Sequence, residues 1–198
     1  MPAIKGNTRI GHSDKLITEA CEYTNSFLSF KPTVAIILNV AADHLDFFKD
    51  LDDIRHSFRE YARLVPDDGA LIINSDIDNI EYFTEGLKCS VITVGSDPNK
   101  SMYSAANITF YEFARGSYDL VVNGEIKDHI TLKVTGKHNI YNSLASIAAA
   151  HFMGISNEDI KTGLMAYEGT DRRFQLKGKL GDITIIDDYA HHPDEIRA

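Results

Sequence analysis

Polar residues of the kinds that bind metals and phosphates gather in four short segments of this 198-residue chain. The first contains Asn39, Asp43 and His44, at the end of an apolar run over residues 33–40 that is typical of a strand buried on both faces. Ligands of open α/β sheets bind at the carboxyl ends of strands, where His44 offers a metal-binding nitrogen that Asp43 can orient. The alternative is a capping aspartate beside a surface histidine with ordinary hydrogen-bond partners.

The second segment, Glu19-Ala-Cys-Glu22, supplies two carboxylates. Residues 15–20 have the pattern of a strand, so Glu19 is expected at a strand end as well. If the two strands are neighbours, Glu19 and His44 converge on one hard cation, and Mg²⁺ is usually held by one or two protein groups together with water and phosphate oxygens. The alternative is a pair of exposed carboxylates on a loop.

The third segment, residues 135–142, opens a predicted helix with the sequence Thr-Gly-Lys-His-Asn-Ile-Tyr-Asn. Exposed peptide N–H groups at a helix start favour an anion, and asparagine side chains both donate and accept hydrogen bonds, which suits the edge of a purine base. The alternative is that Asn139 only caps the helix. Gly136-Lys137 is not a phosphate-binding P-loop, because the earlier glycine and the Ser or Thr after the lysine are both missing.

The fourth segment pairs Arg172-Arg173 with the polar run Asp187-Asp-Tyr-Ala-His-His-Pro193. Two adjacent arginines can clamp a phosphate or carboxylate through bidentate hydrogen bonds. Two acids, a tyrosine and two histidines directly after a strand make an unusually polar cluster. A solvated linker is the alternative for the arginines, and a metal site or a helix start is the alternative for the histidines. We favour a functional site here.

The residues between these segments predict the framework that positions them. Asp50 is a good N-cap for a helix over residues 51–64, whose apolar side chains recur every three or four positions. Asn123-Gly124 lies between β-rich runs within 108–134, which predicts a hairpin in an antiparallel meander. The remaining pattern predicts strands at 70–73, 90–94 and 182–187, and helices at 77–86, from 139 to a cap at Gly154, and after a capping box at Ser156. Together these elements predict an α/β fold with a mostly parallel sheet flanked by helices and an added antiparallel β meander.

Composition limits the classes of protein to which the chain can belong. With 29 acidic against 20 basic residues the net charge is −9, which argues against sequence-independent nucleic-acid binding but not against a small anionic ligand. No apolar run approaches the roughly 18 residues of a membrane span, and the first residues lack a signal-peptide core. Cys21 and Cys89 are too few for a secreted disulfide framework. We therefore expect a cytoplasmic protein that binds neither nucleic acid nor membranes.

Taken in order, the polar segments resemble those of the Mur ligases, ATP-dependent enzymes that form amide bonds. The resemblance extends from about Ile10 to Ala198, and five blocks carry it: Glu19-Ala-Cys-Glu-Tyr23, Asn39-Val-Ala-Ala-Asp-His-Leu-Asp46, Gly136-Lys-His-Asn-Ile-Tyr-Asn142, Arg172-Arg-Phe174 and Asp187-Asp-Tyr-Ala-His-His-Pro193. The family has three domains. The resemblance implies that residues 1–169 form the central ATP-binding domain without its phosphate loop, and that residues 170–198 form the truncated start of the Rossmann-like C-terminal domain.

The spelling of the first and last blocks resembles the branch of the family that adds L-alanine to UDP-N-acetylmuramate through an acyl phosphate. A ligase that recycles muropeptides shares the last block. Several other Mur ligases carry a carbamylated lysine on the helix after the Asp-His motif, whereas residues 51–64 contain no lysine and Phe58 falls near that position. This difference argues against the later peptide-adding enzymes.

The resemblance also implies roles for individual residues of this chain. Glu19 and His44 would hold Mg²⁺, and His138, Asn139 and Asn142 would contact the adenine of ATP. Arg173 would reach the γ-phosphate, Asp188 would position the nucleotide, and Tyr189 and His191 would border the amino-acid site. Arg173, Asp188 and His191 are the residues expected to take part in catalysis.

Other functions stay open at this point. One is a non-catalytic α/β module that binds a nucleotide or a protein partner, which the missing phosphate loop supports. Another is a folate-chain-extending ligase with a similar architecture. If the resemblance to the L-alanine branch holds, UDP-N-acetylmuramate and L-alanine are the small-molecule partners. The chain by itself, without the phosphate loop and the muramate domain, is then expected to be inactive.

Overall fold

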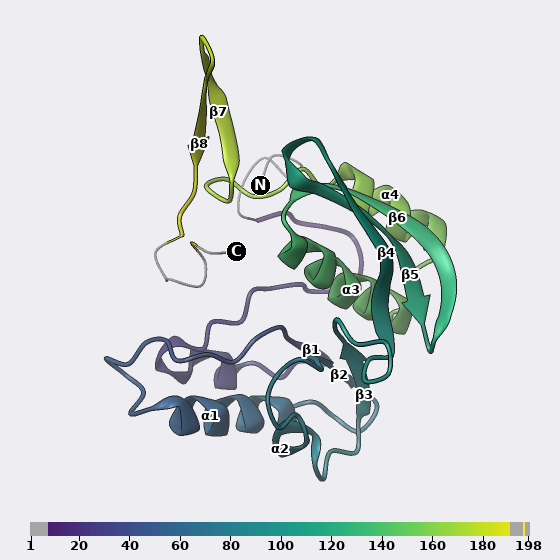
Figure 1. The fold of residues 1–198 in the computed structure, drawn as a ribbon. Coiled ribbons are helices and arrows are strands. Elements are labelled where there is room, and N and C mark those ends of the chain that lie inside the picture. Colours follow the sequence, from purple (N-terminus) through teal and green to yellow (C-terminus); the bar gives the residue numbers. More distant parts are fainter. Residues whose placement is uncertain (1–7, 191–195, 197–198) are drawn as a thin grey trace.

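The computed structural model describes residues 8–190 and residue 196, and its centre is one mixed sheet (Figure 1). The sheet has six strands in the order β1-β2-β3-β4-β5-β6. Their bounds are β1 (Val34–Ile37), β2 (Ala70–Asn74), β3 (Ser90–Val94), β4 (Tyr103–Tyr111), β5 (Arg115–Val122) and β6 (Glu125–Thr135). β1 to β4 pair in parallel, and β4, β5 and β6 form an antiparallel meander that turns at Asn123-Gly124. The predicted fold class is confirmed.

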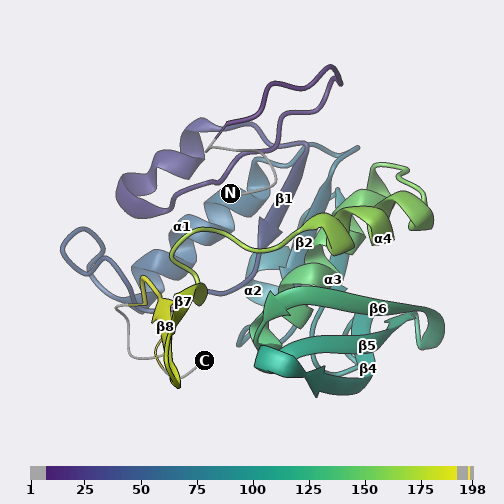
Figure 2. The same ribbon diagram turned by 90° about the horizontal axis from the view of Figure 1, so that it is seen from above.

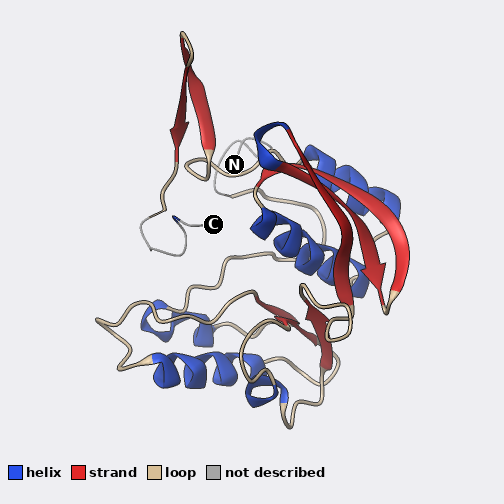
Figure 3. Ribbon diagram, viewed as in Figure 1, coloured by secondary structure: helices blue, strands red, loops and turns tan. Residues whose placement is uncertain are grey.

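Helices cover both faces of the parallel strands, as Figure 3 shows. One side carries η2 (Tyr23–Ser29), α1 (Leu51–Arg63) and α2 (Glu81–Thr84), and the other carries α3 (Lys137–Phe152) and α4 (Asn157–Ala166). A short turn of helix, η3 (Glu112–Ala114), joins β4 to β5. In the described part of the chain, none of the helices has the length and apolar character needed to cross a bilayer.

The two faces of β2 show how the sheet divides the core. Leu71 and Ile73 pack with η2, α1 and α2, whereas Ala70 and Ile72 pack with α3, and all four side chains are completely buried. Successive side chains of a strand point to opposite faces, so a strand covered on both sides needs a continuous apolar run. This is why the sequence of β2 has no polar residue before its last position.

Two helix starts confirm the caps expected from the sequence. Asp50 accepts a hydrogen bond from the main-chain N–H of Asp53 at 3.0 Å, and Ser156 accepts one from the N–H of Asp159 at 3.2 Å. Each cap satisfies a peptide donor that the helix itself leaves without an acceptor. Beyond its cap, α1 buries its apolar face against β1 and β2, which fixes the loop that precedes it.

Three expected elements differ in the structure. Residues 15–20 do not form a strand, and Leu16 and Ile17 are 87% and 85% exposed. β1 is an edge strand buried on one face, with Ile36 40% exposed, because α3 packs on β2, β3 and β4 instead. The helix expected at 77–86 is only the single turn of α2. The apolar residues of these segments favoured buried strands and a longer helix, but the sequence does not show which elements cover each segment.

Residues beyond α4 form a separate hairpin of β7 (Gln175–Leu180) and β8 (Ile183–Asp187). Figures 1 and 2 show the hairpin standing away from the meander in both views. Its apolar side chains are exposed on both strands, including Leu180 at 71% and Ile183 at 64%. A two-stranded hairpin is marginally stable alone in water, so this segment draws little support from its own contacts.

Candidate functional site

The loop after β1 holds His44 in an uncommon backbone conformation. His44 has a φ of 53°, in the left-handed region that residues other than glycine rarely occupy. Asp43 Oδ1 accepts a hydrogen bond from the His44 N–H at 2.7 Å, and the His44 carbonyl accepts from the N–H groups of Phe47 and Phe48, both at 2.9 Å. A backbone conformation of this kind persists only where surrounding contacts hold it in place, and such conformations are frequent at functional sites.

Three side chains with metal-binding atoms meet at this loop. Glu22, Asp43 and His44 each offer one ligand atom, and these atoms all lie within 4.8 Å of one another. His44 Nε2 is 3.6 Å from Glu22 Oε1 and 3.9 Å from Asp43 Oδ2. Two ligands placed about 2.1 Å from one cation stand roughly 3 to 4.2 Å apart. The donor types and the two distances from His44 Nε2 therefore fit a divalent cation such as Mg²⁺ or Mn²⁺.

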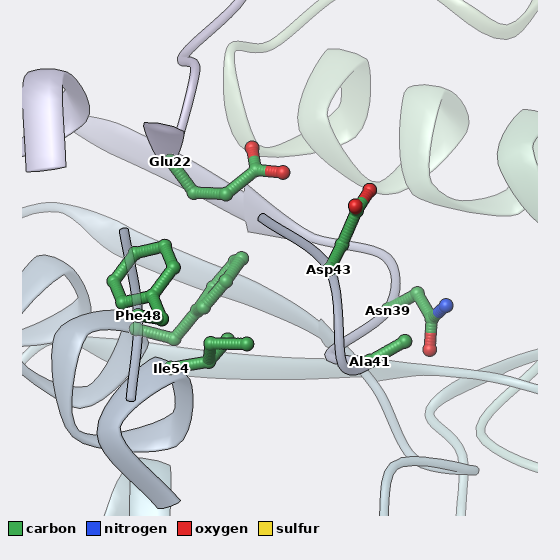
Figure 4. Close-up of a pocket in the computed structure, with 7 residues that line it drawn as sticks. Glu22, Asn39, Ala41, Asp43, Phe48 and Ile54 are labelled. Carbon is green, nitrogen blue, oxygen red and sulfur yellow. The ribbon is translucent and has the colours of Figure 1, made fainter. Parts of the chain in front are cut away.

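Figure 4 shows the cavity that these carboxylates border. It has a volume of about 180 Å³ and is lined by Glu22, Asn39, Ala41, Asp43, Phe48, Ile54 and Phe58. The polar side chains of Glu22, Asp43 and Asn39 lie on one side of it, and the apolar Phe48 and Ile54 lie on the other. Pockets for drug-sized ligands have about 300–1,000 Å³, so this cavity suits a hydrated cation or a phosphate group and not a whole nucleotide.

Tyr23 connects the segment that carries Glu22 with the loop that carries His44. Its ring centroid is 4.7 Å from that of His44, and its hydroxyl donates a hydrogen bond to Asp46 Oδ2 at 2.7 Å. Because the hydrogen bond to the Asp46 carboxylate and the negative charge of that carboxylate both favour the neutral phenol, the pKa of Tyr23 is raised. Tyr23 is the last residue of the motif Glu19-Ala-Cys-Glu-Tyr23, but its spacing in the sequence does not indicate a contact with His44.

Glu19, which the sequence pairs with His44, is exposed and is not part of the three-residue group. The expected pairing relied on a strand over residues 15–20 that would carry Glu19 to the edge of the sheet. Without that strand, Glu22 is the carboxylate of the same motif that faces His44. Both acids belong to the same motif, and the local backbone decides which of them approaches the histidine.

A second group of expected site residues lies at the start of α3. Gly136 occupies the N-cap position with a φ of 94°, so this end of the helix has no capping side chain over its peptide N–H groups. Asn139 Nδ2 donates to the Thr135 carbonyl at 2.7 Å, and Asn142 Nδ2 donates to Asn139 Oδ1 at 3.4 Å. Asn139 therefore ties the helix to β6 and does not serve as its N-cap.

The base of the hairpin lies near this helix start. The pKa of His138 is lowered, mainly by partial burial. The negative charge of Asp188 opposes this shift, and the positive charge of Arg173 adds to it. These charges act on His138 only if Arg173 and Asp188 are close to it. The carboxylate of Asp188 accepts hydrogen bonds from the N–H groups of Phe174 and Ala190, both at 2.7 Å. The structure thus brings together residues from the third and fourth polar segments.

The last two expected residues have different outcomes. Tyr189 lies at the hairpin base, where its ring packs 4.4 Å from the guanidinium carbon of Arg172. His191 lies outside the described residues. The amino-acid site that these two residues were expected to border stays a prediction.

Sequence comparison places this geometry in a known family. The model of the Mur ligase middle domain matches residues 7–150. A UDP-N-acetylmuramate–L-alanine ligase of Lachnospira eligens is 60% identical over 196 residues, covering 99% of this chain and 43% of that protein. The corresponding ligase of Caldanaerobacter subterraneus is 45% identical, covering 99% of this chain and 42% of that protein. The chain spans less than half the length of the curated relatives it matches.

Structure comparison agrees with the sequence. The UDP-N-acetylmuramate–alanine ligase MurC of Thermotoga maritima has a TM-score of 0.73 at 29% identity, covering 87% of this chain and 38% of that one. MurF of Acinetobacter baumannii has a TM-score of 0.73 at 26% identity, covering 88% of this chain and 37% of that one. The chain therefore belongs to the Mur ligase family and contains its middle domain.

Proposed function

We propose that this chain is the central part of a cytoplasmic enzyme that joins L-alanine to UDP-N-acetylmuramate with ATP, in the synthesis of peptidoglycan precursors. The observation that carries the proposal is 60% identity, over 99% of the chain, to a protein named UDP-N-acetylmuramate–L-alanine ligase. Residues 1–169 would form the central domain and residues 170–198 the start of the next one, for which the separate hairpin is the structural support.

The chemistry of amide formation explains why such an enzyme needs ATP. A carboxylate is a poor electrophile, so the carboxylate of UDP-N-acetylmuramate first attacks the γ-phosphorus of ATP and ADP leaves. The acyl phosphate that forms has phosphate as its leaving group, and the amine of L-alanine displaces it through a tetrahedral intermediate. Two anions must approach each other in the first step, so positive charge has to be placed between them.

His44 and the acidic residues around it are the proposed site of a divalent cation, Mg²⁺ in the cell. Bound there, the cation would supply the positive charge that the phosphoryl transfer needs. Glu22 and Asp43 have the geometry to share it with His44, since their oxygens lie 3.6 Å and 3.9 Å from Nε2. Glu19 is the carboxylate that the family resemblance implies, and it lies three residues before Glu22 on the same segment.

The start of α3 is the proposed site of the nucleotide. His138, Asn139 and Asn142 would contact the adenine, because their side chains lie within two turns of one helix end. Arg173 would contact the γ-phosphate and Asp188 would position the nucleotide, for which their electrostatic effect on His138 is the support. Tyr189 and His191 would border the site of L-alanine.

A metal-binding measurement on this chain tests the cation site. Mn²⁺ is the probe, because its electron paramagnetic resonance signal reports the free ion directly. We expect His44→Ala to abolish binding and Glu22→Gln to weaken it at least tenfold, since each removes one ligand. His56→Ala is the matched control, because His56 is an exposed histidine of α1 outside the group. If His44→Ala bound Mn²⁺ as the control does, the cation site would be wrong.

Two further variants and one assay separate the remaining alternatives. If Glu19→Gln lowered the Mn²⁺ affinity more than Glu22→Gln did, the acidic ligand would be Glu19, as the resemblance implies, and not Glu22, as the described geometry favours. The activity itself is measured on the longer protein as ADP release that depends on both UDP-N-acetylmuramate and L-alanine. UDP-N-acetylglucosamine, which lacks the lactyl carboxylate, is the control substrate. ADP release that did not depend on L-alanine would contradict the proposed reaction.

A further inference from the structure

Tyr23 lies where the two halves of the proposed cation site meet. Glu22 lies directly before η2, the short helix that packs on α1, whereas His44 belongs to the loop after β1. Tyr23 follows Glu22 directly, yet its ring packs on the His44 imidazole at 4.7 Å and its hydroxyl reaches Asp46 at 2.7 Å. Phe47 completes the contact with an edge-on ring 6.1 Å away. One side chain thus holds together segments that are about twenty residues apart in sequence.

The segment that carries Tyr23 is itself firmly attached to α1. Phe27 is 1% exposed and stacks on Tyr61 at 4.6 Å. Asn25, which has a left-handed φ of 58°, accepts a hydrogen bond from the Ser57 hydroxyl through its side-chain oxygen. A side chain can orient a neighbour only if its own backbone is held in place. These contacts give Tyr23 such a support.

The imidazole of His44 needs an orienting contact of this kind. The His44 N–H donates to the Asp43 carboxylate and the His44 carbonyl accepts two main-chain hydrogen bonds. These bonds fix the main chain, but they leave the side chain free to turn about its own bonds. A metal-binding histidine is usually held by a partner outside the ligand shell, and loss of that partner costs about 10- to 100-fold in metal affinity. The Tyr23 ring, tilted by 35° against the imidazole at a centroid distance of 4.7 Å, restricts rotation of the imidazole, and the Asp46 hydrogen bond restricts rotation of Tyr23.

We propose that Tyr23 and Asp46 form a latch that positions His44 for the divalent cation. This inference rests on the proposed cation site and adds two positioning residues to it. Neither Tyr23 nor Asp46 is a ligand of the cation in this proposal. The hydroxyl of Tyr23 carries the latch, because it makes the hydrogen bond that ties the ring to the loop that continues from His44. The latch therefore acts on metal affinity through the orientation of one ligand.

A double-mutant cycle of Mn²⁺ affinity tests the latch in the whole chain. Tyr23→Phe keeps the ring and removes the hydrogen bond, so we expect the dissociation constant for Mn²⁺ to rise about tenfold, at the low end of the usual range. Asp46→Ala removes the acceptor and also a negative charge near the cation. The charge effect is the same in both backgrounds and cancels in the cycle. Once Tyr23 is Phe, we expect Asp46→Ala to cost about tenfold less than it does in the original chain.

Tyr111→Phe is the matched control for Tyr23→Phe. Tyr111 is 42% exposed against 38% for Tyr23, and its hydroxyl also donates one hydrogen bond, to the Leu132 carbonyl on the meander. A metal-free measurement accompanies the titration: nuclear Overhauser contacts between the Tyr23 and His44 rings are expected in the original chain and are expected to weaken in Asp46→Ala. The thermal midpoint of each variant is recorded without metal, so that unfolding is not mistaken for lost affinity.

The outcomes separate this inference from the cation site on which it rests. A tenfold loss in Tyr23→Phe that is coupled to Asp46, with no change in Tyr111→Phe, supports the latch. Normal Mn²⁺ affinity in Tyr23→Phe, while His44→Ala still abolishes binding, overturns the latch and leaves the cation site intact. Additive effects of the two substitutions, or absent ring contacts, also overturn it. A chain that binds no Mn²⁺ at all overturns both proposals.

Discussion

A buried hydrogen bond between the meander and α3 allows a quantitative test of how this helix, the proposed site of the nucleotide, is held. Tyr118 on β5 is completely buried, and its hydroxyl lies 2.6 Å from the Ser143 hydroxyl on α3. Ser143 in turn donates to the Ile140 carbonyl at 2.6 Å, so Tyr118 is the donor of the pair. Burial raises the pKa of the Tyr118 phenol, which keeps it neutral and able to donate. We predict that the two single substitutions have unequal costs.

The inequality follows from which group loses its partner. Ser143→Ala leaves the buried Tyr118 hydroxyl without its acceptor, which costs about 1–3 kcal/mol of unfolding free energy. Tyr118→Phe leaves Ser143 bonded to Ile140, so it costs only about 1 kcal/mol. Once Tyr118 is Phe, the buried donor is gone and Ser143→Ala adds little. The double variant is therefore expected to be less destabilised than the sum of the two single variants by about 1 kcal/mol or more.

Urea unfolding followed by circular dichroism measures these differences, with the slope of the transition checked for two-state behaviour. Ser146→Ala is the matched control, because Ser146 lies on the same helix, is exposed and bonds only the Asn142 carbonyl of its own helix at 3.1 Å. We expect this control to change stability by no more than about 0.5 kcal/mol. Equal effects of Ser143→Ala and Ser146→Ala, or strict additivity in the double variant, would refute the reasoning.

Three further predictions concern the helix ends and the hairpin base. Partial burial lowers the pKa of His138 below 6.5, so on acidification the unfolded chain takes up a proton before the folded chain does, and stability falls as the pH drops below about 6.5. The urea midpoints at pH 7.5 and pH 5 should therefore differ less in His138→Gln than in the original chain. Ser156→Ala removes the cap of α4 and should cost about 1 kcal/mol in the same assay, whereas Ser156→Thr, which keeps the hydroxyl, should cost less. In the longer protein of the proposed function, Arg173→Ala should lower kcat on the order of 10³-fold with little change in ATP affinity, and Arg173→Lys should recover only part of kcat. Steady-state kinetics with a separate ATP titration measure both quantities, and a near-normal kcat in Arg173→Ala would contradict the proposed contact with the γ-phosphate.

Elements whose signals are local could be predicted from the sequence. The Asp50 cap and the three- and four-residue spacing of apolar positions place α1 correctly, because capping and amphipathicity depend on residues within the helix itself. The predicted strand Ser90–Val94, which contains three β-branched apolar residues, is β3 as expected, and Asn123-Gly124 turns the chain between β5 and β6. Asn and Gly adopt the positive φ angles that such a turn requires, here 53° and 79°.

Features that depend on distant partners could not be predicted in the same way. An apolar run of strand length looks alike whether one face or both faces are covered, so the exposure of Ile36 on β1 had no sequence signal. Leu16 and Ile17 have strand-forming character but no strand partner in the described chain. The choice between Glu19 and Glu22 follows from the backbone before η2, which no periodicity encodes. Order and spacing of the motifs identified the family because they combine several weak local signals.

The net charge of −9 does not decide whether the chain can hold a triphosphate, because a ligand responds mainly to charges within about 8–10 Å of its site. At the start of α3, Gly136 leaves the first peptide N–H groups without a capping side chain, and the helix dipole favours an anion there. Arg173 adds positive charge beside His138, while the carboxylate of Asp188 is already engaged by two main-chain N–H groups. The lowered pKa of His138 keeps its ring neutral near pH 7, so the ring offers a hydrogen-bonding edge to a base and not a second charge. One helix start and one arginine therefore supply the local positive potential that the proposed nucleotide site needs on an acidic protein.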